Sequence, residues 1–338
     1  MWDIAKLAVV AIVFALLYKT GKIDIAILRL AAARPGLVVA ALVLIFCFAL
    51  FTVERWRWLL WAVDVHIAFA PAFNLTFIGM FFSIALPGAV GGDIVKAYYL
   101  AKGQSQRAAL VATVIFDRLL GLYTMILTAT LAGAVVWGYV SLSGSSPAWW
   151  NGGVQALILF IFGLFAAFSV GGALSMSDSI SRTRFMKKAL EVVPFRDKVE
   201  KIYSAVRRFG DNPGLALAAF GISFFGQLFL YGAIWVLAVA LELNELTVAQ
   251  FLFVIPVCIL INAIPAAPGG LGVGEIGFGA VFALFGSAKG VELAVMYHAV
   301  AITLSLGLGG VIYFAHSRRE GGMVTLKRLE DEREESSF

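Results

Sequence analysis

Five ionisable side chains lie within or beside long apolar stretches of this sequence. They are Asp93, Lys96, Asp117, Arg118 and Glu275. A charged side chain near the centre of a lipid bilayer costs about 2.5–3.5 kcal/mol on insertion scales, so each is by default a candidate for function. The acids can pair with a cationic group or carry a proton, and the bases can hold a phosphate. The alternative for Lys96, Asp117 and Arg118 is that they anchor helix ends at the membrane interface.

Two of these acids end short, similar segments that break a helix. The first segment, PGAVGGD, occupies residues 87–93, and the second, PGGLGVGE, occupies residues 268–275. Each follows an apolar run, interrupts it with proline and glycine, and ends in a carboxylate. In membrane proteins, such interrupted segments in both halves of a chain indicate a substrate site between internal repeats.

The chemistry of a broken helix favours an anion. A helix that restarts after the break presents free N–H groups and the positive end of its dipole, which suit a phosphate. The glycines allow a ligand to approach the backbone closely. The alternative is that glycines serve close helix packing, which is the interpretation we favour for Gly277 and Gly279.

Composition predicts an integral membrane protein. The 338 residues are 61% hydrophobic and 14% charged, against roughly 25% charged in a typical soluble domain. We predict an all-α chain with a single transmembrane domain over residues 1–316 and a charged cytoplasmic tail over residues 317–338. No stretch is long and polar enough for a separate soluble enzyme domain. Cys47 and Cys258 lie in apolar runs, which argues against disulfides.

Patterns for other chemistries are missing from the sequence. The string GVGEIG at residues 272–277 matches a dinucleotide fingerprint, but that motif has meaning only in a soluble βαβ unit and is rejected here. The sequence shows no P-loop, no Ser/His/Asp set and no Cys/His cluster, so we expect no cofactor, no metal and no nucleic-acid partner. His298 falls within the last apolar span, where we favour a packing histidine over the alternative that it faces the cavity.

The apolar runs predict about six full transmembrane helices and two re-entrant broken hairpins. The full spans are predicted at residues 4–18, 36–53, 119–140, 154–172, 215–241 and 293–314. The broken regions are residues 71–100 and 246–286. The first favours a hairpin that does not cross the membrane, and the second is also long enough for two short spans.

The distribution of basic residues predicts the orientation. Residues 175–212 contain nine Lys or Arg and five more follow Phe314, so this loop and the C-terminus are predicted to be cytoplasmic. Six spans place the N-terminus there as well, with residues 19–34 outside despite their four basic side chains. The two hairpins then enter from opposite faces, as an inverted repeat predicts. A parallel repeat or a chance likeness is the alternative.

Two basic segments are assigned to the membrane surface. Within the loop 175–212, residues 195–209 are basic and amphipathic, which predicts an interfacial helix on the anionic inner leaflet. Arg55 and Arg57 alternate with tryptophans in ERWRWLLW, residues 54–61. We interpret them as an interfacial anchor rather than as a site for headgroup recognition.

Three motifs together resemble a known membrane family. They are LPGAVGGD followed by AYYL at residues 86–100, FDRLLGL at 116–122 and PGGLGVGE at 268–275. The combination is similar to the flippase-like transmembrane family that includes the membrane domain of lysylphosphatidylglycerol synthases. The resemblance covers about residues 36–314 and implies an all-helical domain with re-entrant elements that moves a lipid between leaflets. The functional positions that it implies are Pro87, Gly88, Asp93, Asp117, Arg118, Pro268, Gly269 and Glu275.

The sequence departs from the synthases after its last span. Only 24 residues follow Phe314, so the soluble aminoacyl-transfer domain is expected to be absent and lysine transfer is not implied. The family resemblance also leaves the lipid open, because its members are thought to serve varied lipids.

We therefore predict a flippase or transporter of the cell (inner) membrane, and not an enzyme, that moves a phospholipid or isoprenoid-type lipid through a midplane cavity. Its predicted substrate-binding residues are Pro87, Gly88, Asp93, Lys96, Asp117, Arg118, Pro268, Gly269, Gly270 and Glu275. One alternative is a membrane-embedded glycosyl- or headgroup transferase that acts on a lipid-linked substrate. Another is a scaffold that binds a soluble partner through residues 175–212, and a homo-oligomer is compatible with the sequence.

Overall fold

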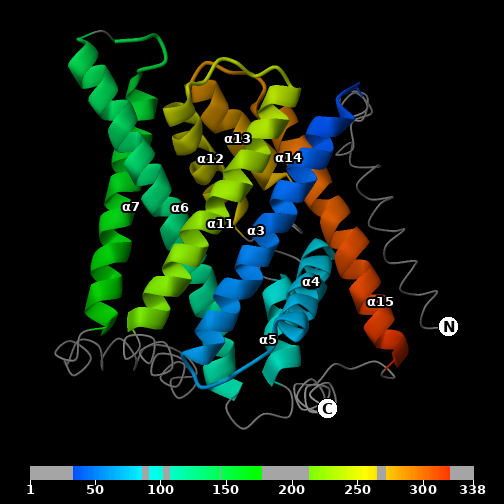
Figure 1. The fold of residues 1–338 in the computed structure, drawn as a ribbon. Helices are drawn as coiled ribbons and strands as arrows, with labels where there is room; N and C mark the ends of the chain where they lie inside the picture. Colours follow the sequence, from blue (N-terminus) through cyan, green and yellow to red (C-terminus); the bar gives the residue numbers. More distant parts are fainter. Residues whose placement is uncertain are drawn as a thin grey trace.

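All regular structure in the part of the chain that can be described is helical. The computed structural model describes residues 33–85, 91–101, 107–144, 146–176, 213–264 and 272–319 (Figure 1). Five helices there are long and apolar enough to cross a membrane: Pro35–Trp61, Ala109–Ser143, Gly152–Ala173, Gly214–Ala240 and Gly290–Ala315. The prediction of an all-α integral membrane protein is confirmed.

These five helices correspond to five of the six predicted spans. They belong to α3 (Pro35–Trp61), α6 (Arg107–Ser143), α7 (Gly152–Met176), α11 (Pro213–Ala240) and a last span built from α14 (Gly290–Leu304), η2 (Ser305–Gly309) and α15 (Gly310–Arg319). The predicted span at 4–18 lies outside the described residues, as do residues 177–212 of the basic loop and most of the tail. Those predictions remain untested.

Helix α6 begins earlier than its predicted start at residue 119. It has 37 residues, about 55 Å at 1.5 Å per residue, and so exceeds the roughly 30 Å of a hydrocarbon core. The prediction started after Asp117 and Arg118 because two charges interrupt the apolar run there. In the structure the helix continues through both residues, because other helices supply partners for their charges.

Both predicted breaks separate pairs of short helices. Helix α4 (Phe69–Ala85) packs against α5 (Gly91–Ala101), and α12 (Val248–Asn262) packs against α13 (Val273–Leu284). The longest of the four, α4, has 17 residues, about 26 Å, which is too short to cross the core alone. The breaks at 86–90 and 265–271 lie outside the described residues. Five predicted site residues fall in them: Pro87, Gly88, Pro268, Gly269 and Gly270.

The helices form two units of the same order that run in opposite directions. A long helix, a hairpin and a second long helix occur as α3, α4–α5, α6 and again as α11, α12–α13 and the last span. The two hairpins lie toward opposite ends of the bundle (Figure 1). Helix α12 packs against α6, α4 packs against η2 and α15, and α3 packs along α11. This exchange of contacts is the arrangement that an inverted repeat predicts.

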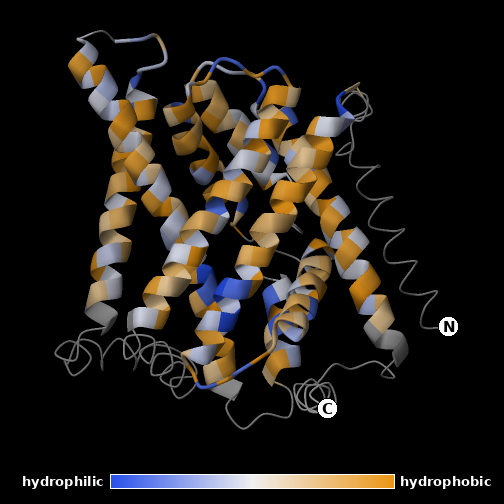
Figure 2. Cartoon of the chain, viewed as in Figure 1, coloured by the Kyte–Doolittle hydropathy of each residue, from blue (hydrophilic) through white to orange (hydrophobic). Residues whose placement is uncertain are grey.

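Apolar residues cover most of the outer faces of the bundle. Figure 2 shows hydrophobic colouring along α3, α7 and α11, with hydrophilic residues gathered around the lower part of α3. Exposed apolar side chains such as Leu217, Phe160 and Val135 are therefore placed to face lipid. The polar residues at the lower part of α3 belong to the candidate site.

Two cations, Arg34 and Lys289, donate to carbonyls at the C-terminal end of α11, near the second hairpin. Arg34, just before α3, donates from Nη1 to the carbonyl of Val239 at 3.1 Å and pairs with Glu242. Lys289, just before α14, donates to the carbonyls of Leu241 at 3.1 Å and Glu242 at 2.7 Å. Cations at the end of α11 satisfy its last carbonyls and interact favourably with its dipole. The starts of α3 and α14 are thereby held at the end of α11.

The last span contains a π-helical turn at η2, and Gly309 in this turn touches α4. A Cβ atom added at Gly309 would meet the carbonyl oxygen of Phe77 and would lie 3.1 Å from Cβ of Phe81. A Cβ added at Gly307 would meet nothing within 4 Å. The close approach of the first hairpin to the last span therefore depends on glycine at one position of the turn and not at the other.

We expect Gly309→Ala to lower the thermal unfolding midpoint of the purified protein in detergent, because overpacking costs about 1–3 kcal/mol. The matched variant Gly307→Ala should leave the midpoint unchanged or raise it, because alanine is the better helix former by about 1 kcal/mol. Tryptophan fluorescence during heating measures both. Equal midpoints would contradict close packing of η2 on α4.

Candidate functional site

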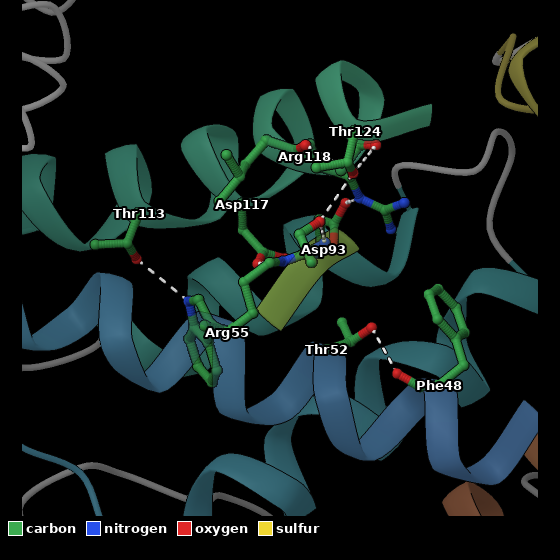
Figure 3. Close-up of polar contacts among 12 residues, drawn as sticks. Phe48, Thr52, Arg55, Asp93, Thr113, Asp117, Arg118 and Thr124 are labelled. Carbon is green, nitrogen blue, oxygen red and sulfur yellow. Dashed lines mark hydrogen bonds and ion pairs between the residues drawn. The ribbon is translucent and has the colours of Figure 1, made fainter. Parts of the chain in front are cut away.

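A buried ion pair joins three helices at the centre of the first unit. Nε of Arg55 on α3 donates to Oδ1 of Asp117 on α6 at 2.7 Å, and Nη1 of Arg55 donates to Oγ of Ser223 on α11 at 2.8 Å. The side chains of Arg55 and Asp117 are 7% and 5% exposed. Figure 3 shows them facing one another between α3 and α6. The interpretation of Arg55 as an interfacial anchor was wrong, because its guanidinium points into the bundle.

Arg57, two residues further on, remains compatible with the anchor interpretation. Its Nη1 donates to Glu54 at 2.5 Å, and its guanidinium lies 5.3 Å from the ring centroid of Trp61 and 5.8 Å from that of Phe69. Stacking of a cation on aromatic rings is common at interfaces. The two arginines of one motif therefore have different roles.

A glycine on α6 makes room for the buried guanidinium. A Cβ atom at Gly121, one turn after Asp117, would lie 3.2 Å from Nη1 of Arg55. Thr124, almost one further turn along, has its hydroxyl 3.0 Å from Oγ of Ser223. Buried charges need such complete hydrogen bonding, because their desolvation is otherwise uncompensated. The guanidinium is thus held in a fixed position and orientation.

Lys96 is buried beside this pair and contacts an aromatic ring. It is 4% exposed, and its ammonium lies 3.6 Å from the ring centroid of Trp56. The indole Nε1 of Trp56 donates to Oγ1 of Thr113 at 3.3 Å, which fixes the ring. Within the described residues, no carboxylate oxygen lies within ion-pair distance of the ammonium. A cation–π contact partly replaces the lost hydration but supplies no negative charge.

Asp93 and Arg118 form a second ion pair at the edge of the same cluster. Asp93 is the third residue of α5 and Arg118 follows Asp117 on α6 (Figure 3). Arg118 is 50% exposed and Asp93 is 14% exposed, so the pair marks the more open side. Lys96 interacts electrostatically with all four other charges of the cluster. The structure therefore brings together every predicted site residue of the first half that it describes.

This first-unit cluster has a surplus of positive charge. It consists of Arg55, Lys96 and Arg118 with Asp93 and Asp117, which is three cations against two carboxylates. One net positive charge remains in a largely buried position beside the first turn of α5. Such an arrangement can bind an anion through charge-assisted hydrogen bonds.

Glu275, the predicted acid of the second half, lies in a separate cluster. It is the third residue of α13, where one carboxylate oxygen accepts from the backbone N–H of Gly272 and the other lies 3.0 Å from Nδ1 of His298 on α14. Gly272 has φ of 91°, which glycine adopts without strain. No ion pair or hydrogen bond between described residues links Glu275 to the first-unit cluster.

The sequence interpretation did not place His298 beside Glu275. It is 7% exposed and pairs with Glu275, while its Nε2 is buried and has no hydrogen-bond partner. A signal for it existed in the repeat: Arg118 follows Asp93 by 25 residues and His298 follows Glu275 by 23. The similar separations place a base at a comparable position in each unit, with His298 two residues out of register with Arg118.

The ion pairs of Arg55 and Arg57, both on α3, allow their contributions to the stability of the protein to be compared. We expect Arg55→Gln to lower the free energy of unfolding by about 3–5 kcal/mol, because it leaves Asp117 buried and unpaired. Arg57→Gln removes a partly exposed ion pair on the same helix and should cost about 1 kcal/mol or less. Denaturant unfolding of the purified proteins in detergent measures both. Equal losses would contradict a central structural role for Arg55.

Comparisons with known proteins agree with this architecture. Residues 4–309 match the family described as the lysylphosphatidylglycerol synthase TM region. A UPF0104 membrane protein of Pyrococcus horikoshii is 28% identical over 300 residues, which cover 84% of this chain and 85% of that protein. No solved structure matches the chain. This multi-pass membrane protein therefore belongs to the family of the transmembrane region of lysylphosphatidylglycerol synthases.

Proposed function

We propose that this protein moves a lipid with a phosphate-bearing headgroup between the leaflets of a cell membrane, while the acyl chains stay in the bilayer. Family membership and the buried charge in the first unit support the proposal. On the charge bias of its loops, the protein is proposed to lie in the cell (inner) membrane with both termini cytoplasmic. The headgroup would reach the first-unit cluster from the end of the bundle at which the α4–α5 hairpin lies.

The ammonium of Lys96, buried without a direct ion pair among the described residues, is the observation that carries this proposal. A buried charge without a partner of opposite sign is costly. The ring of Trp56 contacts the ammonium at 3.6 Å, but a phosphate would add the missing negative charge. The first turn of α5 precedes Lys96 by little more than one turn, so the positive end of its dipole acts on the same anion, although the N–H of Gly92 there already donates to Oγ of Ser83 at 3.1 Å.

The other charges of the first-unit cluster have two proposed roles: one is the first contact with the phosphate, and the other is to hold the cations and helices in position. Arg118 is half-exposed, so a phosphate would meet it before it meets the deeper Lys96. Asp93 holds Arg118 toward α5. Asp117 and Arg55 neutralise one another and keep the surrounding helices in place. A graded set of cations of this kind suits a headgroup that must enter and leave.

A membrane-embedded transferase is less well supported by the described residues. General-base catalysis requires a carboxylate within reach of a substrate proton. Both carboxylates of the first-unit cluster are engaged by arginines, Asp93 by Arg118 and Asp117 by Arg55. Neither is placed to abstract a proton, which favours binding over catalysis.

We expect Lys96→Met to slow lipid translocation at least about tenfold, equivalent to about 1.4 kcal/mol. The assay uses proteoliposomes with acyl-labelled fluorescent phosphatidylglycerol or phosphatidylethanolamine, and dithionite bleaches the outer leaflet. Lys96→Arg keeps the cation and its stacking on Trp56, and should retain more activity than the methionine variant.

The control for this experiment is Lys289→Gln, which removes a cation at the end of α11, away from the first-unit cluster. It should translocate lipid at the wild-type rate. The proposal fails if wild-type protein moves neither lipid faster than empty vesicles do, or if Lys96→Met is as fast as wild type.

A further inference from the structure

The two units place an acid and a base in equivalent positions. In each unit the third residue of the second hairpin helix is an acid, Asp93 in α5 and Glu275 in α13. Each acid pairs with a basic side chain on the long helix that follows, Arg118 or His298. A guanidinium is charged at every physiological pH, whereas an imidazole gains and loses its proton in that range. The second pair is therefore the one that protonation can switch.

Hydrogen bonds around Glu275 identify which nitrogen of His298 carries hydrogen. A carboxylate only accepts, and Oε1 of Glu275 lies 3.0 Å from Nδ1 of His298, so Nδ1 is the donor. In a neutral imidazole the other nitrogen, Nε2, is then a bare acceptor. Nε2 is buried and has no partner among the described residues.

A second bare acceptor lies on the same side of α13. Oδ1 of Asn262, the last residue of α12, is also buried without a hydrogen-bond partner. A Cβ atom added at Gly274 would lie 2.5 Å from this oxygen and 2.6 Å from Cε1 of His298, the carbon bonded to Nε2. Two buried acceptors beside the same backbone position of α13, each without a hydrogen-bond partner, are costly.

A proton on Nε2 of His298 creates a positive charge beside the carboxylate of Glu275. It also turns the buried nitrogen into a donor, on the side of α13 where the amide of Asn262 lies. We infer that Glu275, His298 and Asn262 form a proton-binding site, and that lipid movement through the first-unit cluster is coupled to its occupancy. The coupling rests on the proposed function, whereas proton binding does not.

Few other ionisable groups surround this site. The ring centroid of Tyr297 lies 5.3 Å from that of His298. The helices packed against α13 and α14 also carry Cys47 on α3, Tyr231 on α11 and Cys258 on α12. The charged side chains described on those helices and on α14 lie toward helix ends: Arg34, Glu54, Arg55, Arg57 and Glu292. Glu275 is the acid among the described residues that lies within ion-pair distance of His298.

The site is placed to act on the second hairpin. Gly274 lies where α13 meets both the end of α12 and His298 of α14, without space for a side chain. Helix α13 starts directly after the break at 265–271. A proton that draws His298 and Asn262 together therefore holds the two hairpin helices against α14, and its release removes that hold.

Proton binding can be measured by itself, without an assay of lipid transport. The sequence contains three histidines, so a His66→Gln/His316→Gln background leaves His298 alone. In nanodiscs, the nitrogen-15 spectrum of its imidazole should show hydrogen on Nδ1 in the neutral form and on both nitrogens in acid. The protonated fraction near about pH 6 should fall several-fold in Glu275→Gln and, by a smaller factor, in Asn262→Leu.

Coupling is tested in the translocation assay under an imposed pH gradient. We expect a gradient of about two pH units to change the wild-type rate several-fold, because an imidazole, unlike a guanidinium, can take up and release a proton at physiological pH, and expect His298→Gln to abolish that response. The matched control is His66→Gln, whose exposed ring stacks on Trp61 outside the site. It should respond to the gradient as wild type does.

The outcomes separate the two proposals. If wild-type protein moves no lipid but His298 titrates as described, the proposed function fails and the proton site stands. If lipid moves but His298 does not take up a proton, or if His298→Gln keeps the gradient response, the inference is wrong. A His298 spectrum that changes only when an amine-headed lipid is added would also overturn it, in favour of a headgroup site.

Discussion

A charge inside a membrane protein must find its partner within the protein, and the pair formed by Arg55 and Asp117 shows how far this constraint shapes the fold. The pair lies between α3, α6 and α11, and α11 of the second unit packs on both of the other helices. Desolvation makes either charge costly alone, so neither helix can shift without the other. Because Asp117 is satisfied in this way, α6 continues through a charged turn that would otherwise have ended it. Lys96 and Arg118 are positioned on that rigid base.

The repeat places an acid and a base at corresponding positions in each unit, and the type of base differs between the two units. Both units end their hairpin break in a glycine followed by an acid, and both bring a base from the next long helix. Among the described residues, the first unit surrounds its pair with further charges, which makes the cluster net positive. In the second unit, Nε2 of His298 and Oδ1 of Asn262 are buried acceptors without a partner. One scaffold thus pairs its first acid with an arginine and its second acid with a histidine.

Sequence patterns predicted the positions of the membrane spans and of the two breaks. Apolar run length placed the spans, and the proline–glycine segments placed both breaks, because lipid tolerates a broken helix only where protein covers it. The same patterns do not show how each helix is rotated about its axis, and this rotation decides which side chains face the interior. Arg55 and Arg57 share one tryptophan-rich motif, and their different fates depend on Gly121 and Asp117 on another helix. His298 was hidden for the same reason, since an apolar span does not reveal which face meets Glu275.

The two hairpins lie toward opposite ends of the bundle. Each is too short to cross the hydrocarbon core, so neither closes the bundle along its full height. The helix after each break starts inside the bundle, and the acid in its first turn is held by a base on the next span. In each half, therefore, the first turn of a short helix supplies an acid, Asp93 in α5 and Glu275 in α13. Where each helix is interrupted, the protein itself thus supplies the opposite charge that lipid cannot supply.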